Sequence, residues 1–353
     1  MDKSCYKKLA EHLDQLPGGF APSKTGADIE LLQRLFTPEE AELAIHLSLN
    51  QESAQSIAVR SGLPLAKTEE SLTEMSKKGL IFSTQKQGTT FYQAVPFIIG
   101  IYEFQVNRLD ADLIQDLDNY WESIEPRIRP KTIPQLRTIP VEESIEPHLE
   151  ALPYEQVKQL VKMHDRYAVA PCICRRSMRI KGHACNAPEE SCLVFGEWAD
   201  YYVQGGRGRS IKHDEVLDIL NRADSANLVL QPTNSIDVAA ICCCCGCCCG
   251  ILTSLKRFRK PARLVSSSFY AQLDTMLCNG CWDCIDRCQM GALSENGECV
   301  DFNSDRCIGC GLCVTTCPSE ALTLERKSEE KILPVPDTLD KTWREISRAQ
   351  FDS

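Results

Sequence analysis

The chain has 353 residues, of which 43% are hydrophobic and 25% are charged. This composition is ordinary for a folded protein and excludes a wholly disordered chain, while the length suffices for two or three domains. The formal net charge of −10 disfavours a nucleic-acid binder that uses its whole surface, although it leaves room for a local basic face.

Residues 27–96 are predicted to form a winged-helix-like domain. Residues 37–40 read Thr-Pro-Glu-Glu, which supplies a helix N-cap, a first-turn proline and a capping-box glutamate, so a helix should begin there. Two further helices are expected over 53–60 and 64–78, each closely followed by a glycine. Two strands joined by a turn are expected within 80–92. Three helices followed by a hairpin resemble a winged helix, which is a variant of the helix-turn-helix.

The charge of the third of these helices argues against DNA binding. Its three lysines are balanced by three glutamates, namely Lys67, Lys77 and Lys78 against Glu69, Glu70 and Glu74. Because DNA binding depends heavily on neutralising phosphates, a helix without net charge is a poor recognition helix. A role in protein interaction or in forming a homodimer is therefore expected for this domain.

Residues 97–165 are predicted to be a helical segment followed by a linker. Leucines recur at helical spacing in the first part, which predicts a helix from 97 to about 123. Residues 124–150 predict an extended linker because they contain five prolines. A further helix is expected over 154–164.

Residues 166–267 are predicted to form a cysteine-rich domain of mixed α/β structure. Its apolar patterns indicate a strand at 168–171, a helix at 214–223 and a second strand at 227–231. Seven cysteines then lie within 242–249, and a helix is expected to follow them.

Residues 268–326 contain two copies of the motif C-x-x-C-x-x-C-x-x-x-C, spaced 29 residues apart. Three closely spaced thiolates can bind three irons of one cubane, whereas the fourth cysteine starts a helix that leads away and reaches the other cluster. One 4Fe–4S cluster is therefore assigned to Cys278, Cys281, Cys284 and Cys317. The other is assigned to Cys307, Cys310, Cys313 and Cys288.

This segment resembles the two-cluster bacterial ferredoxins over about 55 residues. The resemblance implies a pseudo-symmetric ferredoxin fold that transfers single electrons. Two positions depart from the family without removing a ligand. Gln289 replaces the proline that follows the fourth cysteine, and Trp282 replaces a glycine whose counterpart here is Gly311. Zinc is disfavoured as the metal because it prefers two C-x-x-C pairs that are separated by a longer gap.

The remaining features predict a cytoplasmic protein. The tail, 327–353, is charged and has Leu339, Trp343 and Ile346 at helical spacing. The first 20 residues lack the apolar stretch of a secretory signal, so the 21 cysteines are expected to bind metal rather than to form disulfides. The uncharged stretch 238–255 is rich in cysteine and interrupted by glycines, so no membrane span is expected.

Eleven further cysteines between 172 and 249 predict at least one more metal site. An all-thiolate site favours an iron–sulfur cluster or zinc over hard cations, and neighbouring clusters favour the former. Packing of some thiols as small hydrophobic side chains is the alternative. The candidate ligands are Cys172, Cys174, Cys185, Cys192, Cys244, Cys245, Cys248 and Cys249.

Basic residues gather next to these cysteines, within 175–181 and 256–263. They are Arg175, Arg176, Arg179, Lys181, Lys256, Arg257, Arg259, Lys260 and Arg263. In an acidic chain, such clustering predicts a docking face for an acidic redox partner. A positive field that raises cluster potentials and an ordinary solvated helix face are the alternatives.

The predicted fold class is α+β and multidomain, with a winged helix, an α/β cysteine-rich domain and a dicluster ferredoxin domain. The arrangement resembles ferredoxin-domain proteins of anaerobic bacteria that carry a winged-helix domain in front. The predicted function is electron transfer, in which the chain relays single electrons to or from a partner oxidoreductase rather than acting as an enzyme by itself. The alternatives are an Fe–S-responsive DNA-binding regulator and an Fe–S enzyme whose middle cluster binds substrate at an open iron.

Overall fold

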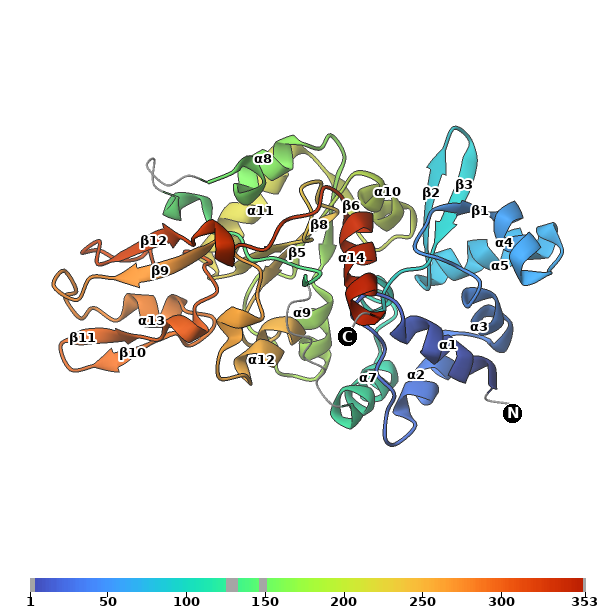
Figure 1. Ribbon diagram of the computed structural model, residues 1–353, viewed down its shortest axis with the longest axis horizontal. Coiled ribbons are helices and arrows are strands. Elements are labelled where there is room, and N and C mark those ends of the chain that lie inside the picture. The colour runs from blue at the N-terminus through green and yellow to red at the C-terminus, as the bar shows by residue number, and fades with distance from the viewer. Residues whose placement is uncertain (1–3, 125–132, 146–150, 352–353) are drawn as a thin grey trace. The chain divides into compact units, whose positions relative to one another are not determined.

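The computed structural model describes residues 4–124, 133–145 and 151–351 (Figure 1). The chain divides into two compact units. The first contains Met1–Gln135, Asp200–Arg209 and Asp340–Ser353, and the second contains Leu136–Ala199 and Ser210–Leu339. The cysteine-rich region and the ferredoxin-like region, which the sequence predicts as separate domains, therefore lie in one unit.

The first unit is mainly helical and carries a three-stranded sheet of order β1-β3-β2. Its α3 begins at the predicted capping box, in which Thr37 and Glu40 each accept a hydrogen bond from the other's backbone N–H. The elements follow the order expected for a winged helix, an assignment that remains a prediction. They are α1 (Ser4–Asp14), α2 (Ala27–Leu35), α3 (Pro38–Ala44), β1 (Glu52–Ser53), α4 (Ala54–Ser61), α5 (Leu65–Lys78), β2 (Phe82–Lys86) and β3 (Thr89–Gln93).

The helix expected from 97 to 123 is broken into separate turns. Phe97–Ile101 forms a π-helical turn, α6 is confined to Tyr102–Phe104, and α7 runs over Ala111–Ser123. The break arises because Ile99 and its neighbours leave helical geometry, with a φ of 61° at Ile99. A new helix then begins where the side chain of Asp110 accepts a hydrogen bond from the backbone of Leu113.

The C-terminal helix α14 (Leu339–Phe351) packs into this first unit. Trp343 is fully buried and its indole N–H donates to the side chain of Gln135 over 3.2 Å. The predicted apolar face of the tail helix thus contributes to the core. The segment after α10 (Gly196–Gln204) also belongs to the unit, because Arg207 donates to the carbonyls of Ser76 and Lys77 at the end of α5.

The second unit is built on a five-stranded sheet of order β6-β4-β5-β8-β7. Strand β5 pairs antiparallel with both β4 and β8, and β8 pairs antiparallel with β7. The predicted α/β pattern is present in the elements β4 (Tyr167–Pro171), α9 (Ile173–Ile180), β5 (Glu190–Phe195), β6 (Arg209–Ile211), α11 (His213–Ser225), β7 (Val229–Pro232), β8 (Ala240–Cys244) and α12 (Gly250–Lys256), preceded by α8 (Val157–Lys162).

The part of 124–150 that the structure describes is not the extended linker that the sequence predicts. Residues 125–132 and 146–150 lie outside the described residues, whereas Ile139 and Val141 are almost fully buried in the second unit. The backbone N–H of Ile139 donates to Leu230 of β7, and that of Val141 donates to Cys310. Although the prolines predict a linker, the alternating apolar residues at 139 and 141 pair with neighbouring backbone and pack into the core.

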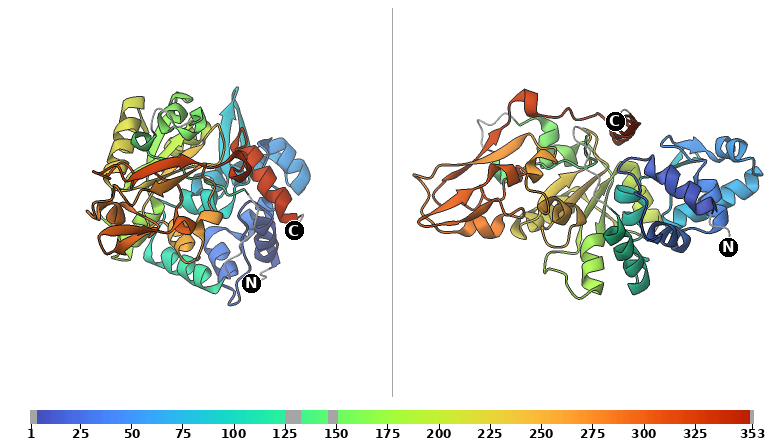
Figure 2. Two further views of the ribbon diagram at one scale, coloured as in Figure 1. Left: turned by 60° about the vertical axis from the view of Figure 1, so that its left-hand side comes forward. Right: turned by 60° about the horizontal axis from the view of Figure 1, so that its bottom comes forward.

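The ferredoxin-like region consists of two small antiparallel sheets and one short helix (Figures 1 and 2, orange to red). Strand β9 (Phe269–Leu273) pairs with β12 (Leu322–Arg326), and β10 (Leu293–Asn296) pairs with β11 (Cys299–Phe302). Helix α13 (Asp283–Arg287) follows the first cysteine loop. Within the described ranges, no helix has both the length and the apolar character needed to cross a membrane.

Candidate metal centres

Cysteines from both copies of the repeated motif line one cavity in the ferredoxin-like region. Its walls include Cys278, Cys281 and Cys284 from the first copy and Cys317 from the second. Trp282 and apolar side chains from β9, β11 and β12 also line it, together with the polar residues Asn279 and Ser319. A cavity with four converging thiols fits a thiolate-bound cluster, and the fourth thiol comes from the other copy, as the motif spacing predicts.

The remaining cysteines of the two copies form the second group. Cys307, Cys310 and Cys313 lie close enough to Cys288 that negative charge on Cys288 raises the pKa of each of their thiols. Burial is the larger cause and raises the pKa of Cys310 to about 12. Cys288, the fourth cysteine of the first copy, therefore lies beside the three clustered cysteines of the second copy.

Burial makes a bare thiolate unfavourable at Cys284 of the first group, as it does at Cys307, Cys310 and Cys313 of the second. It raises the pKa of Cys284 to about 11, with further increases from the charges of Cys281 and Cys317. A thiol with such a pKa stays protonated at neutral pH unless a cation compensates its charge. Bound iron would supply that compensation, so the buried thiols of these groups fit metal ligands better than free thiols.

The two cysteine loops share an unusual backbone conformation at equivalent positions. Trp282 has a φ of 68°, and Gly311, which lies 29 residues later, has a φ of 74°. Glycine adopts this left-handed conformation freely, whereas a side chain costs about 1–2 kcal/mol. The tryptophan is held there with its ring lining the cavity of the first cysteine group, so the loop geometry of the repeat is kept despite the substitution.

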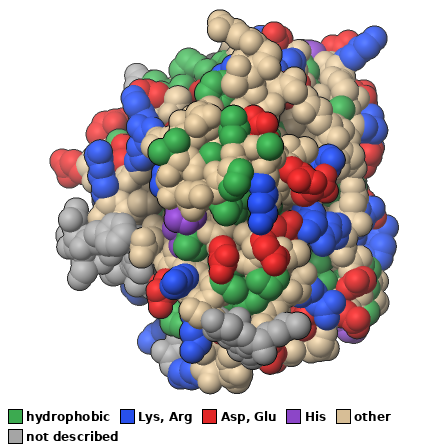
Figure 3. Space-filling model, turned by 90° about the vertical axis from the view of Figure 1, so that its right-hand side faces the viewer, with side chains coloured by type: hydrophobic (Ala, Val, Ile, Leu, Met, Phe, Trp, Pro, Cys, Tyr) green, Lys and Arg blue, Asp and Glu red, His purple; other side chains and the backbone are tan. Residues whose placement is uncertain are grey.

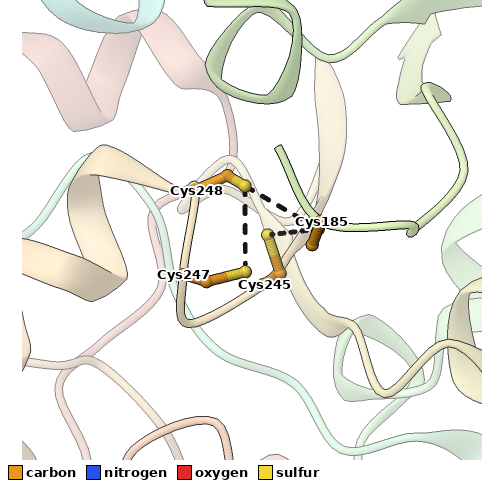
Figure 4. A group of neighbouring side chains, drawn as sticks. All are labelled: Cys185, Cys245, Cys247 and Cys248. Carbon is orange, nitrogen blue, oxygen red and sulfur yellow. Dashed lines mark hydrogen bonds between the residues drawn. The ribbon is translucent and has the colours of Figure 1, made fainter. Parts of the chain in front are cut away.

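Four cysteines of the middle region gather in a compact group, here called the Cys185 quartet (Figure 4). The sulfur of Cys185 lies 3.7 Å from those of Cys245 and Cys248, and that of Cys247 lies 3.7 Å from that of Cys248. All four sulfurs lie within 4.8 Å of one another. A tetrahedral ion with metal–sulfur bonds of about 2.3 Å keeps its ligands about 3.8 Å apart, so the quartet fits one thiophilic metal ion.

The electrostatic surroundings of the quartet favour a thiolate at Cys245. Burial opposes ionisation, but hydrogen bonds from the Cys248 N–H, the Cys247 thiol and the Arg175 guanidinium together lower the pKa of Cys245 to about 6. The guanidinium Nη1 of Arg175 lies 3.6 Å from this sulfur. A pKa below neutral makes Cys245 ready to bind a metal ion at physiological pH.

The predicted middle ligands divide between two places. Cys185, Cys245 and Cys248 come together with Cys247, which is not among the ligands predicted from the sequence. The others, Cys172, Cys174, Cys192, Cys244 and Cys249, lie outside this quartet. The close spacing of Cys245, Cys247 and Cys248 around Gly246 could have indicated Cys247 as a ligand. The run of seven neighbouring cysteines, however, allows many different sets of four ligands.

The basic residues near the cysteines have different surroundings. Arg175 is 1% exposed, so it is excluded from the predicted docking face. Arg176 and Arg179 both form ion pairs with Glu189, and Lys260 pairs with Asp305. In contrast, Arg257, Arg259 and Arg263 are exposed after α12. The 256–263 segment therefore retains an accessible positive surface.

Comparisons with known proteins identify the C-terminal region. Residues 300–323, which contain the second cysteine motif, match the 4Fe-4S binding domain family. The chain is 35% identical over 75 residues to an archaeal-type glutamate synthase (NADPH) of Thermotoga maritima, covering 21% of this chain and 15% of that protein. It is 36% identical over 70 residues to a ferredoxin of Rickettsia felis, covering 19% of this chain and 62% of that protein.

A third relative is covered over most of its length. Over 60 residues, the chain is 37% identical to the pyruvate synthase subunit PorD of Methanothermobacter marburgensis, covering 17% of this chain and 70% of that subunit. The chain thus spans only 15% of the glutamate synthases but more than two thirds of PorD. No solved structure matches this chain.

Proposed function

The chain belongs to the 4Fe-4S ferredoxin family through its C-terminal region, and from this premise we propose that it relays single electrons between its metal centres and a partner oxidoreductase. The proposal assigns one 4Fe–4S cluster to Cys278, Cys281, Cys284 and Cys317. It assigns a second to Cys307, Cys310, Cys313 and Cys288. When bound, such clusters supply reversible one-electron chemistry.

The observation that carries this proposal is the exchange of the fourth cysteine between the two copies of the motif. Cys317 lines the cavity of the first copy, and Cys288 lies beside Cys307, Cys310 and Cys313 of the second. Packing supports it too, since Cys288, Cys313 and Cys317 contact the same small apolar core as Cys284. This exchange brings the two clusters close together, as stepwise electron transfer requires.

The Cys185 quartet is proposed as a third centre of the same unit. Lys256 donates from Nζ to the carbonyl of Gly246 over 2.7 Å, and the N–H of Gly246 donates to Gln289. Gln289 follows Cys288, a proposed ligand of the second cluster. Iron in the quartet would extend the electron path through this contact, whereas zinc would fix the position of the loop without carrying electrons.

An acidic redox protein is the proposed partner. The exposed side chains of Arg257, Arg259 and Arg263 offer positive charge close to the cysteine loops, which would orient such a partner and speed its encounter. One relative is named as a subunit of pyruvate synthase, which is consistent with a component that works with a second protein.

Regulation through DNA binding is less well supported. In α5, Lys77 pairs with Glu74 and Lys78 pairs with Glu40, so two of its three lysines are already neutralised. Acidic and basic side chains are interspersed on the face that Figure 3 displays, rather than collected into one basic surface. Such a surface offers little to the phosphate backbone. No specific observation favours the other alternative, an Fe–S enzyme whose middle cluster binds substrate at an open iron.

Anaerobically purified full-length protein tests the proposal. We expect at least about eight irons and eight sulfides per chain, which two 4Fe–4S clusters require. After reduction, two interacting EPR signals should appear, and the protein should reduce cytochrome c by single electrons. Colourless protein that contains zinc in place of iron would overturn the proposal.

The same protein tests the partner surface. Replacing Arg257, Arg259 and Arg263 with glutamate should slow electron transfer to an acidic flavodoxin, with the largest effect at low ionic strength. The matched control replaces Lys162, Lys212 and Arg222, three exposed basic residues of the same unit, in the same way. Equal rates for both triple variants would exclude 256–263 as the docking segment.

A further inference from the structure

Seven cysteines of the middle region lie outside the Cys185 quartet, and all of them except Cys243 form a second set, here called the second thiol group. They are Cys172, Cys174, Cys192, Cys242, Cys244 and Cys249. Although they are far apart in the sequence, they are gathered at one end of the five-stranded sheet by β4, α9, β5, β8 and the start of α12.

Strand register explains how this group assembles. Cys192 of β5 and Cys242 of β8 are directly paired across the two strands, so their side chains share one face of the sheet. Cys244 lies two residues farther along β8 and therefore points to that same face. Cys172 follows β4, the other neighbour of β5, and its N–H donates to the carbonyl of Glu189 over 2.8 Å.

The thiols form a continuous series of contacts. Cys174 is hydrogen-bonded to the thiols of Cys172 and Cys249. Cys244 is hydrogen-bonded to those of Cys249 and Cys242. Cys244 and Cys249 are only 6% and 5% exposed, so this is an interior site rather than a surface cluster. Thiols used only as apolar packing would have no reason to converge from several separate elements of the fold.

Backbone N–H groups are directed at two of these sulfurs. The N–H of Gly250 donates to the sulfur of Cys174, and the N–H of Leu252 donates to that of Cys249. Hydrogen bonds of this kind stabilise thiolates over thiols. They also accompany iron–sulfur clusters, where they adjust the reduction potential.

Arg175 is a second and independent sign of negative charge at this place. Its guanidinium is 1% exposed and donates to the carbonyl of Cys243 and the sulfur of Cys245. Its Nε has no hydrogen-bond partner, and no carboxylate pairs with Arg175 among the described residues. A buried cation is costly without an anion beside it. Metal-bound thiolates at Cys172 and Cys245, whose charges both act on Arg175, would provide that anion.

We propose that Cys172, Cys174, Cys244 and Cys249 bind a 4Fe–4S cluster that is distinct from the metal of the Cys185 quartet. Among the described residues, only the quartet holds all its sulfurs within 4.8 Å, so the second thiol group is more open. A cubane needs the wider arrangement because each cysteine binds a different iron. The inference rests on the proposed function only in that the chain acquires iron–sulfur clusters.

The test uses full-length protein, purified anaerobically from iron-supplemented cells, and counts metal in matched variants. The Cys174→Ala/Cys249→Ala variant should lose about four irons and four sulfides, while keeping the EPR signals of the ferredoxin clusters. The Cys185→Ala/Cys248→Ala variant should lose only the metal of the quartet. Cys5→Ala is the control, because Cys5 lies in the first unit.

The total metal content provides a measurement that does not depend on how well a variant folds. Wild-type protein should contain about twelve irons in clusters, four more than the ferredoxin motifs account for. Mössbauer spectra should then resolve the extra cubane. A total of about eight irons, or unchanged iron in Cys174→Ala/Cys249→Ala, would overturn this inference and leave the ferredoxin function intact. Fewer than eight would contradict the proposed function itself.

Discussion

The backbone N–H of Gly246 donates a hydrogen bond of 2.6 Å to the side-chain Oε1 of Gln289. Gly246 lies between Cys245 and Cys247 of the quartet, and Gln289 directly follows Cys288. Proline, which the two-cluster ferredoxins resembling this chain carry at the position of Gln289, has no side-chain acceptor. The glutamine thus attaches the ferredoxin-like region to the cysteine loop of the middle region.

Replacing Gly246 with alanine should disturb this attachment. A Cβ at Gly246 would lie 2.3 Å from the backbone carbonyl oxygen of Gln289, which is too close for any contact between them. Because one of the two backbones must move, we expect unfolding to become easier by about 1–3 kcal/mol and the metal of the quartet to be partly lost. Urea denaturation followed by circular dichroism, together with metal analysis, measures both effects.

Gly250 provides the matched control for this change. A Cβ at Gly250 would meet no atom within 4 Å, and the residue begins α12 without a left-handed backbone. Gly250→Ala should therefore match or slightly exceed the wild type in stability, since alanine favours a helix. Equal losses in the two variants would show that the contact with Gln289 is unimportant.

The cysteine-rich loop shows what could and could not be predicted from the sequence. The ferredoxin motif has a fixed spacing, so its eight cysteines and their exchange could be proposed from the chain alone. The run of seven cysteines has no such spacing. Its division into a quartet containing Cys247 and a second group depends on Cys185 and on the register of β5 with β8, which are tertiary features.

Exchange of the fourth cysteine between the motifs can be tested with two double variants. Cys284→Ala/Cys317→Ala removes two ligands from one proposed cluster, so it should abolish one EPR signal and about four irons while preserving the other cluster. Cys288→Ala/Cys317→Ala removes one ligand from each, so both signals should change. Loss of both signals in the first variant would mean that each motif binds its own cluster.

Trp282 should protect the first cluster at a cost in backbone strain. Trp282→Gly suits the φ of 68° and should relieve about 1 kcal/mol of strain, but it opens the cavity to water and oxygen. We expect the visible absorbance of the cluster to bleach faster in air. Trp282→Phe keeps a ring over the cavity and serves as the control. Identical bleaching rates for glycine, phenylalanine and tryptophan would refute a protective role.

The extent of the two units is another feature that local sequence patterns missed. Prolines in 124–150 suggested a linker, yet Arg137 is buried and donates to the carbonyls of Thr233 and Ser235. Those partners lie about a hundred residues away, so no local pattern reveals them. Short-range signals did better: the capping box of α3 and the glycines after α4 and α5 end or begin helices where expected.

A buried ion pair should stabilise the second unit. Arg326 of β12 lies 2.6 Å from Glu155, whose side chain is 3% exposed. Arg326→Met would leave the carboxylate buried without its cation, which should lower the free energy of unfolding by about 3–5 kcal/mol. Glu329, the exposed second partner of Arg326, provides the control, because Glu329→Gln should cost under about 1 kcal/mol. Similar urea midpoints for the two variants would contradict this account.

Acid should destabilise the first unit through His12 of α1. Burial lowers the pKa of His12 below its ordinary value of 6.5, and the charge of the neighbouring His46 lowers it further. A hydrogen bond to the Leu47 carbonyl raises the pKa in part but does not reverse the shift. Below pH 6.5 the unfolded chain therefore binds a proton at this position before the folded chain does. The free energy of unfolding should fall by at most about 1.4 kcal/mol per pH unit, until the folded pKa is reached.

The measurement compares the melting temperatures of wild type and His12→Gln between pH 8 and pH 5. Above pH 6.5 both states of the chain carry a neutral His12, so the difference between the two proteins should not vary with pH. As the pH falls below 6.5, the wild type should lose stability faster than the variant, which cannot take up this proton. A difference between wild type and His12→Gln that stays constant over the whole range would exclude His12 as the group responsible.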